Sequence, residues 1–195
     1  MNQKTVLIIV GILVILCCCV AGLGLAGMWY AGDSLGRAFE GANDPERVAR
    51  VADSIADYDA PAGYEQMAFD IFSMKYIFMM PANPTRPIIM LAQFPASMVS
   101  DQEEMRREME RSMAQQTGQG SADMQSVEEK TYTIRGQQVQ ATIMEGVADM
   151  DGRKVMMRQM IVIFEGRNGV AALMFAGPRD GWDQAMIDSF ITSIR

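Results

Sequence analysis

The chain has 195 residues, with 17 Lys and Arg against 24 Asp and Glu and a formal net charge of −7. Every acidic residue, and every basic residue except Lys4, follows residue 30, and this acidic balance argues against nucleic acid and anionic lipid surfaces as main partners. The sequence contains no histidine, which excludes Ser-His-Asp and Cys-His catalytic systems and imidazole metal sites.

The first element is an apolar run from Val6 to Ala26 that contains no charge, amide or hydroxyl. As a helix it would span about 32 Å, close to the thickness of a bilayer's hydrocarbon core. Trp29 and Tyr30 follow at the position of an interfacial aromatic belt. We therefore predict that residues 6–30 form a transmembrane anchor in contact with the lipid bilayer. A signal peptide cleaved near Ala26 is the alternative, but its apolar core would be shorter.

The charges beside this run predict its orientation. Lys4 lies in the tail 1–5, whereas residues 27–35 contain no Lys or Arg, so the tail is expected in the cytoplasm and the rest of the chain outside it. The predicted location is a bacterial-type cytoplasmic membrane, crossed once. The only cysteines, Cys17, Cys18 and Cys19, lie inside the run, which leaves no disulfide framework outside it and offers a poor match to lipidation.

Residues 31–60 are expected to form a juxtamembrane linker with one short helix. Asp44 is a suitable N-cap and Pro45 suits the first helical position. An apolar residue then recurs at helical spacing, and we expect the helix to end near Asp57. The apolar positions are Val48, Val51, Ala52 and Ile55.

The remaining domain, residues 61–195, begins with a pattern of strands. The run from Phe69 to Met80 predicts one or two strands, and residues 87–94 predict another. A capping box at Ser100 then predicts a helix that ends at Thr117, followed by a loop to Ser126. The buried stripe of this helix is expected to be Met105, Met109 and Met113.

Paired strands follow, separated by turn signals. We expect strands at residues 132–134, 139–147, 155–164 and 170–176, with hairpins at Asp151-Gly152 and Asn168-Gly169 and an end at Gly177-Pro178. The last helix is predicted to be capped by Asp180. Its expected apolar face is Trp182, Met186, Ile187, Phe190, Ile191 and Ile194, and its expected wet face is Asp183, Asp188, Ser189 and Thr192.

This order predicts an α+β fold, an antiparallel sheet covered by helices. The ending VAALMFAGPRDGWDQAMIDSFITSIR resembles the close of the PsbP-like or DcrB-like α/β/α sandwich domains. The resemblance follows the element order of residues 61–195 and is detailed only in the last quarter of the chain. It implies a mostly non-catalytic domain that binds partners. Because that superfamily shares no set of functional residues, none is assigned here.

Several local patterns contain residue types that are found in catalytic or metal sites. Ser73 with Lys75, and Ser126 with Lys130, lack the S-x-x-K spacing of a Ser-Lys pair. The adjacent carboxylates at 103–104 and 128–129 would face apart on a helix, so neither suits an acid–base dyad. Ordinary solvated side chains are the expected roles.

Two further patterns concern metals. Asp149, Asp151 and Gly152 resemble part of a calcium loop, but Arg153 and Lys154 follow in place of acidic ligands. Methionine is frequent, at 19 of 195 residues, with clusters at 79–80, 105–113 and 156–160. Thioethers bind Cu(I), but methionine also fills apolar cores in place of leucine or lines adaptable grooves for apolar peptides or lipids.

The sequence therefore predicts no catalytic residue, no cofactor and no metal ligand. The function expected is that of a membrane-anchored, extracytoplasmic binding domain with a protein partner. An undetected carboxylate-based hydrolase and a Met-rich Cu(I)-binding protein are the alternatives. Two converging carboxylates in a compact pocket would favour the hydrolase, whereas an apolar groove would favour binding.

Overall fold

A computed structural model of the chain describes residues 41–71, 74–95, 124–150 and 152–195. The predicted anchor, Val6 to Ala26, and the predicted helix from Ser100 to Thr117 lie outside these residues. Within the described ranges, no helix combines the length and the apolar character needed to cross a membrane.

Helix α3 (Pro45–Ile55) matches the helix predicted after Asp44. The Asp44 Oδ1 atom accepts a hydrogen bond of 2.8 Å from the backbone N–H of Glu46, and proline in the first turn loses no helical hydrogen bond. The buried side chains of α3 are Val48, Val51 and Ile55. Its predicted cap and buried face are therefore confirmed.

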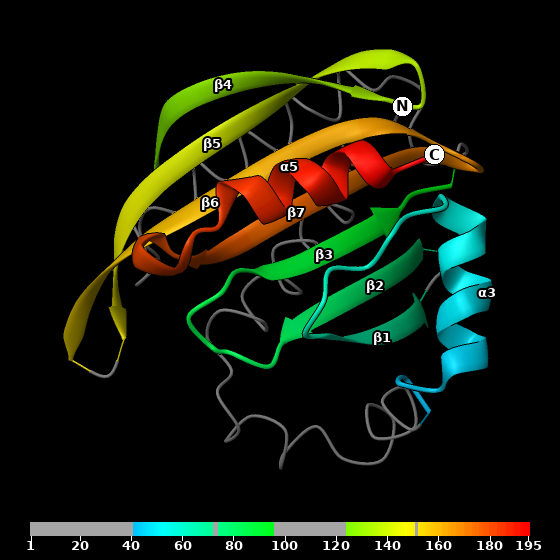
Figure 1. Ribbon diagram of the computed structural model, residues 1–195, viewed down its shortest axis with the longest axis horizontal. Helices are drawn as coiled ribbons and strands as arrows, with labels where there is room; N and C mark the ends of the chain where they lie inside the picture. Colours follow the sequence, from blue (N-terminus) through cyan, green and yellow to red (C-terminus); the bar gives the residue numbers. More distant parts are fainter. Residues whose placement is uncertain (1–40, 72–73, 96–123, 151) are drawn as a thin grey trace, which may run out of the picture.

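The main element is a seven-stranded sheet in the order β1-β2-β3-β7-β6-β5-β4, in which all neighbours are antiparallel (Figure 1). The strands are β1 (Tyr64–Ile71), β2 (Met74–Pro81), β3 (Ile88–Gln93), β4 (Gln125–Ile134), β5 (Gln137–Met150), β6 (Arg153–Gly166) and β7 (Gly169–Pro178). The run from Phe69 to Met80 is thus parts of two strands. The predicted antiparallel sheet with helices is confirmed at this level of detail.

Both predicted hairpins in the second half of the sheet are present. Gly152 has a φ of +76°, and its N–H donates to Asp149 Oδ1 at 2.9 Å, which closes the turn between β5 and β6. The turn between β6 and β7 joins the paired residues Gly166 and Gly169, so its two central residues are one position earlier than Asn168-Gly169.

Strand β4 begins earlier than the sequence indicates. Gln125 and Ser126 already pair with β5, so the predicted loop to Ser126 is wrong at its end. A bulge between Ser126 and Glu128 interrupts the register and leaves Val127 53% exposed. A bulge and charged side chains on an edge strand oppose pairing with another chain, which explains why this segment shows no hydrophobic alternation.

The two sides of the sheet differ in what packs on them. The first face carries α3 and α5, whose buried residues join inward-facing strand residues such as Ile77, Leu91 and Phe175 in one core. The second face is the opposite side of the same strands, with Phe69, Tyr76 and Ile163 in a separate cluster. In Figure 1, α5 lies in front of the central strands and α3 crosses the ends of β1 and β2.

Helix α5 (Gln184–Ser193) follows a 3-10 turn, η2 (Arg179–Gly181). The predicted cap at Asp180 is wrong, because η2 occupies that position. Asp183 is the N-cap, and its Oδ1 atom accepts a hydrogen bond of 3.0 Å from the N–H of Met186. The predicted apolar face is confirmed, since its last four members are buried and Trp182 and Met186 pack against them. The buried four are Ile187, Phe190, Ile191 and Ile194.

Strands β5 and β6 continue beyond their neighbours as a two-stranded ribbon. β4 stops pairing at Glu145, and β7 stops at Met157. On the ribbon, Val147 pairs with Met156, and these side chains are 44% and 36% exposed. Figure 1 shows the ribbon at the lower left, away from α3.

Candidate functional site

An open groove of about 600 Å³ runs along α3. Its walls come from α3, from the segment that follows it, from β1 and from the last residue of the chain. The lining residues are Asn43, Pro45, Val48, Ala49, Ala52, Asp53, Ala56, Asp57, Tyr58, Ala60, Gln66 and Arg195. A concave surface with apolar walls and a few polar groups is the usual form of a ligand site.

Small side chains on α3 make room for this groove. Ala49, Ala52 and Ala56 follow one another at helical spacing beside the buried stripe of the helix. Ala49 is exposed, whereas Ala52 is half-buried against the core. A larger residue at Ala49 would fill the groove, because Ala49 is exposed in its wall.

Tyr58 provides one of the polar groups that line the groove. Its hydroxyl donates to Gln66 Oε1 at 2.7 Å, and its ring meets that of Phe190 edge-on, with centroids 5.5 Å apart. Burial, and secondarily the negative charge of Asp53, raise the pKa of the Tyr58 hydroxyl. The hydroxyl therefore remains a neutral hydrogen-bonding group at physiological pH.

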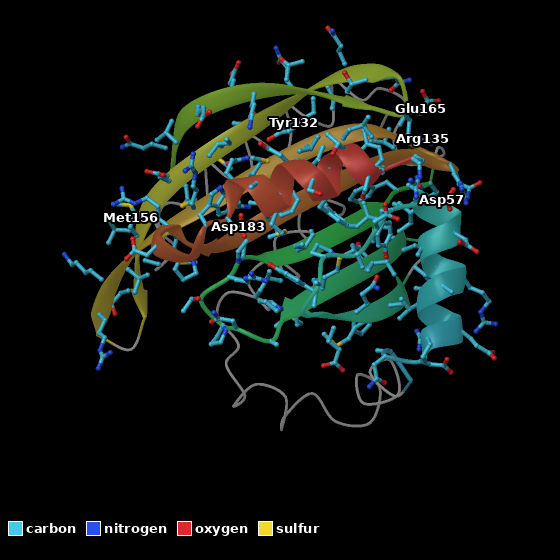
Figure 2. The ribbon with its side chains drawn as sticks, in the orientation of Figure 1. Asp57, Tyr132, Arg135, Met156, Glu165 and Asp183 are labelled. Atoms are coloured by element: carbon cyan, nitrogen blue, oxygen red, sulfur yellow. The ribbon has the colours of Figure 1, made fainter. Side chains whose placement is uncertain are left out.

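The charged groups at the end of the groove are paired within the chain. The Asp57 carboxylate accepts from Arg167 Nη2, and Arg195 Nη2 lies 3.2 Å from Asp59 Oδ1. The backbones of Asp57 and Arg195 also exchange two hydrogen bonds, of 3.1 and 2.8 Å. These contacts fix the shape of this end. Asp57 is labelled in Figure 2, beside the C-terminal end of α3.

A second polar cluster joins α5 to β4. Asp188 accepts from Lys130 at 2.9 Å, from Tyr132 at 2.6 Å and from Gln184 at 2.8 Å. Burial would raise the pKa of the Asp188 carboxyl, but the hydrogen bonds from Tyr132, Lys130 and Gln184 outweigh burial and lower it. Burial raises the pKa of Tyr132, and its bond to Asp188 adds to the rise. This cluster holds the helix on the sheet. Asp188 lies on the wet face as predicted, with 38% of its side chain exposed, but it is also paired with β4, which the helical pattern does not indicate.

The structure does not bring together the Ser-Lys and carboxylate pairs that the sequence offered as candidate catalytic groups, as far as they lie in the described residues. Lys130 forms a salt bridge with Asp188. In β4, the bulge between Ser126 and Glu128 separates Lys130 from Ser126. Glu128 binds Arg158 at 3.0 Å, while Glu129 is the next residue of a strand and points to the other face. Ser73 lies outside the described residues, as do Glu103 and Glu104.

The candidate metal ligands are dispersed as well. Asp149 is used by the turn at Gly152, and Asp151 lies outside the described residues. Met79 is buried while its neighbour Met80 is 39% exposed, because successive strand residues face opposite sides. Met156 lies on the ribbon and is labelled in Figure 2, whereas Met160 is in the first-face core. In the described part of the chain, no group of three His, Cys, Asp or Glu side chains could hold a metal ion.

Sequence reasoning missed the groove because its walls come from distant segments. Gln66 and Arg195 reach it only through the pairing of β1 and the return of the C-terminus to Asp57. One local signal was present, the alanine positions 49, 52 and 56 beside the buried stripe of α3. Small residues on a helix permit close approach of any neighbour, so this signal identifies no ligand.

No protein-family model and no curated protein matches this sequence. Among solved structures, the chain is similar to that described as "Crystal structure of LpqN involved in cell envelope biogenesis of Mycobacterium tuberculosis". The TM-score is 0.32 and the identity is 16%, over 69% of this chain and 76% of that chain. This likeness defines neither a family nor an activity for the present chain, and the PsbP-like resemblance stays a prediction.

Proposed function

We propose that this chain is a membrane-anchored domain that lies outside the cytoplasm and binds a partner in the groove along α3, without catalysing a reaction. The observation that carries the proposal is the open groove of about 600 Å³, which combines small apolar side chains with the amide of Gln66 and the hydroxyl of Tyr58. An extended segment of a partner protein fits such a surface, because its backbone groups need hydrogen-bonding partners and its side chains need apolar contacts.

The charges beside the groove support binding over hydrolysis. A carboxylate-based hydrolase needs two carboxyl groups that converge on one bond. Of the two aspartates in the groove wall, Asp57 is neutralised by Arg167, and Asp53 is exposed on α3. We therefore assign the groove a role in recognition, with Tyr58 and Gln66 as its polar contacts.

Site-specific photo-crosslinking tests the groove. A photoreactive residue at Ala60, an exposed position in the groove wall, is expected to capture one discrete protein in intact cells. Ala49→Trp fills the groove and is expected to remove that adduct. Arg50→Trp is the matched control, because Arg50 is exposed on the same helix but does not line the groove. Equal adducts in the two variants, or none in either, would refute binding at this site.

Protease accessibility tests the location. Protease added to cells with a permeabilised outer layer is expected to digest the domain, because the single Lys4 before the apolar run predicts a cytoplasmic N-terminus. A domain that stays protected until the cells are lysed would contradict the orientation. A mature protein that begins near Gly27 would contradict the anchor.

A further inference from the structure

The second face of the sheet is apolar and buried, yet both described helices pack on the first face. Phe69, Tyr76 and Ile163 on the second face are 5%, 2% and 4% exposed. Side chains on an uncovered sheet face would be largely exposed, so another layer must lie on them. In the described part of the chain, only Ala42, Phe94 and Met124 join this cluster from outside the strands.

Met124, which directly follows the segment 96–123, and Phe94, two residues before that segment, both belong to this face. Phe94 follows β3, is fully buried and is part of the second-face cluster. Met124 precedes β4 and packs against the same cluster. The described residues at both ends of this segment therefore pack their side chains on the second face.

The direction of the strands gives an independent argument. Four antiparallel steps separate β3 from β4, so these two strands run in the same direction. Connections between parallel strands of one sheet are right-handed in almost all proteins. In Figure 1, β3 runs from left to right, β4 lies above it, and α5 lies in front. A right-handed connection from β3 to β4 then passes behind the sheet, across the second face.

The length of the predicted helix suits this path. Four strand spacings of about 4.8 Å and seven residues along β7 at about 3.3 Å each give a diagonal of roughly 30 Å. The seven residues are the offset from Val170, which is bonded to Phe94, to Gly177, which aligns through Arg158 and Glu145 with Gln125 at the start of β4. A helix from Ser100 to Thr117 would be about 27 Å long.

The chemistry of the two surfaces also matches. The second face is lined by methionines, namely Met67, Met74, Met90, Met124, Met144 and Met174. The predicted helix has an apolar stripe of methionines and charged residues elsewhere. Flexible thioether side chains pack well against irregular apolar surfaces. We infer that the second face is the docking surface for residues 100–117 of the same chain, which pack there through Met105, Met109 and Met113.

This assignment narrows the search for the partner. A Met-lined apolar face is also a possible receptor for a foreign peptide or lipid, and the sequence alone left that role open. If the chain's own helix occupies the second face, the methionines serve internal packing, and the groove along α3 remains the surface for the partner. The inference does not depend on the proposed function, because it concerns the opposite side of the sheet.

Disulfide trapping in the full-length chain tests the inference. With Cys17, Cys18 and Cys19 replaced by alanine, Met174→Cys is combined in turn with Met105→Cys, Met109→Cys and Met113→Cys. At least one pair is expected to form an intramolecular disulfide on mild oxidation. Met160→Cys is the matched control, because Met160 lies in the neighbouring strand on the first face and is expected to trap none of the three. No disulfide with Met174→Cys, or equal trapping with both, would overturn the docking.

The native cysteines, Cys17 to Cys19, test whether another segment or a second copy of the chain lies on the second face. In an otherwise unchanged chain, Met174→Cys is expected to form no disulfide with residues 17–19 and no disulfide-linked dimer. An internal bond to that segment would assign the face to the membrane anchor, and a dimer would assign it to a second copy. Either result would overturn the inference without bearing on the groove along α3.

A charge substitution provides a second measurement. Met109→Asp would place a carboxylate against the second face, and Met174 is then expected to become several-fold more reactive toward peroxide, as read by mass spectrometry. Arg107→Asp puts the same group on the predicted wet face and should leave that reactivity unchanged. Equal reactivity of Met174 in the two variants and the unaltered chain would contradict docking through the methionine stripe.

Discussion

The two faces of the sheet are built from different side chains, although they share every strand. On β7, Leu173 and Phe175 face α5, while Met174 between them faces the other way. The first face holds mainly branched and aromatic residues with well-defined rotamers, whereas the second holds six methionines beside four aromatic residues. The first face is therefore expected to be sensitive to changes of shape, and the second tolerant of them.

The largest expected effect is at the centre of the first face. Phe190 is 2% exposed, and its ring meets those of Phe175 and Tyr58 with centroids 6.0 and 5.5 Å away. Phe190→Ala is expected to lower the free energy of unfolding by about 3 to 5 kcal/mol. Urea unfolding of the full-length protein measures this loss, with Thr192→Ala, on the exposed side of α5, as the control. An unchanged midpoint for Phe190→Ala would remove α5 from the core.

The turn that leads into α5 is expected to be the next most sensitive point. A Cβ added at Gly181 would lie 1.6 Å from the backbone oxygen of Thr85, so one of the two loops must move. Gly181→Ala is expected to destabilise the domain by about 1 to 3 kcal/mol, the usual cost of overpacking. Asp180→Ala in the same turn is the control, because Asp180 is exposed. Equal unfolding midpoints for the two variants would show that the loops separate freely.

Local sequence signals predicted most of the elements on the first face. The cap at Asp44 and the apolar spacing of α3 and α5 depend on neighbours within one helix, and the turn at Gly152 depends on its positive φ. Strand order could not be predicted this way, because pairing β3 with β7 joins residues 78 to 88 positions apart. The same limit hid the groove, whose walls meet only when Arg195 returns to Asp57.

The pairing of Asp188 with β4 could not be predicted for the same reason. Its wheel position predicted a wet side chain, and 38% of that side chain is indeed exposed. Its partners Lys130 and Tyr132 lie on β4, more than 50 positions away, and no helical pattern indicates them. The cap was predicted at Asp180 and not at Asp183, because the 3-10 turn before Asp183 could not be distinguished from a first helical turn.

The Asp188 cluster predicts a pH dependence of stability at the rim of the first face. Because the folded-state pKa of Asp188 lies below its ordinary value of 3.8, the carboxylate stabilises the fold at higher pH. That contribution is lost as pH falls through the folded-state pKa. Asp188→Asn is expected to cost about 1 kcal/mol near neutral pH, since solvent screens this half-exposed group. The difference in the free energy of unfolding between Asp188→Asn and the unaltered chain should be smaller at about pH 3. A difference independent of pH would contradict an ionic role.

The smallest effect is expected on the second face, and it tests the comparison on adjacent residues of one strand. Met174 and Phe175 follow each other on β7, but Phe175 is fully buried against Phe190, while Met174 is half-buried on the second face. Met174→Leu keeps the volume and loses only a 2.9 Å hydrogen bond from Gln159 Nε2 to the sulfur, so it should cost less than about 1 kcal/mol.

Phe175→Leu is the matched change on the first face. It removes the edge-on ring contact with Phe190 and leaves unfilled volume among side chains that cannot rearrange, so it should cost clearly more than Met174→Leu, by about 1 kcal/mol or more. Urea unfolding of the two single variants and of the double variant measures both costs and their coupling. If Met174→Leu destabilises the protein as much as Phe175→Leu, the second face is as tightly specified as the first. The methionines of the second face would then be required for their shape, and the second face could not be described as an adaptable surface.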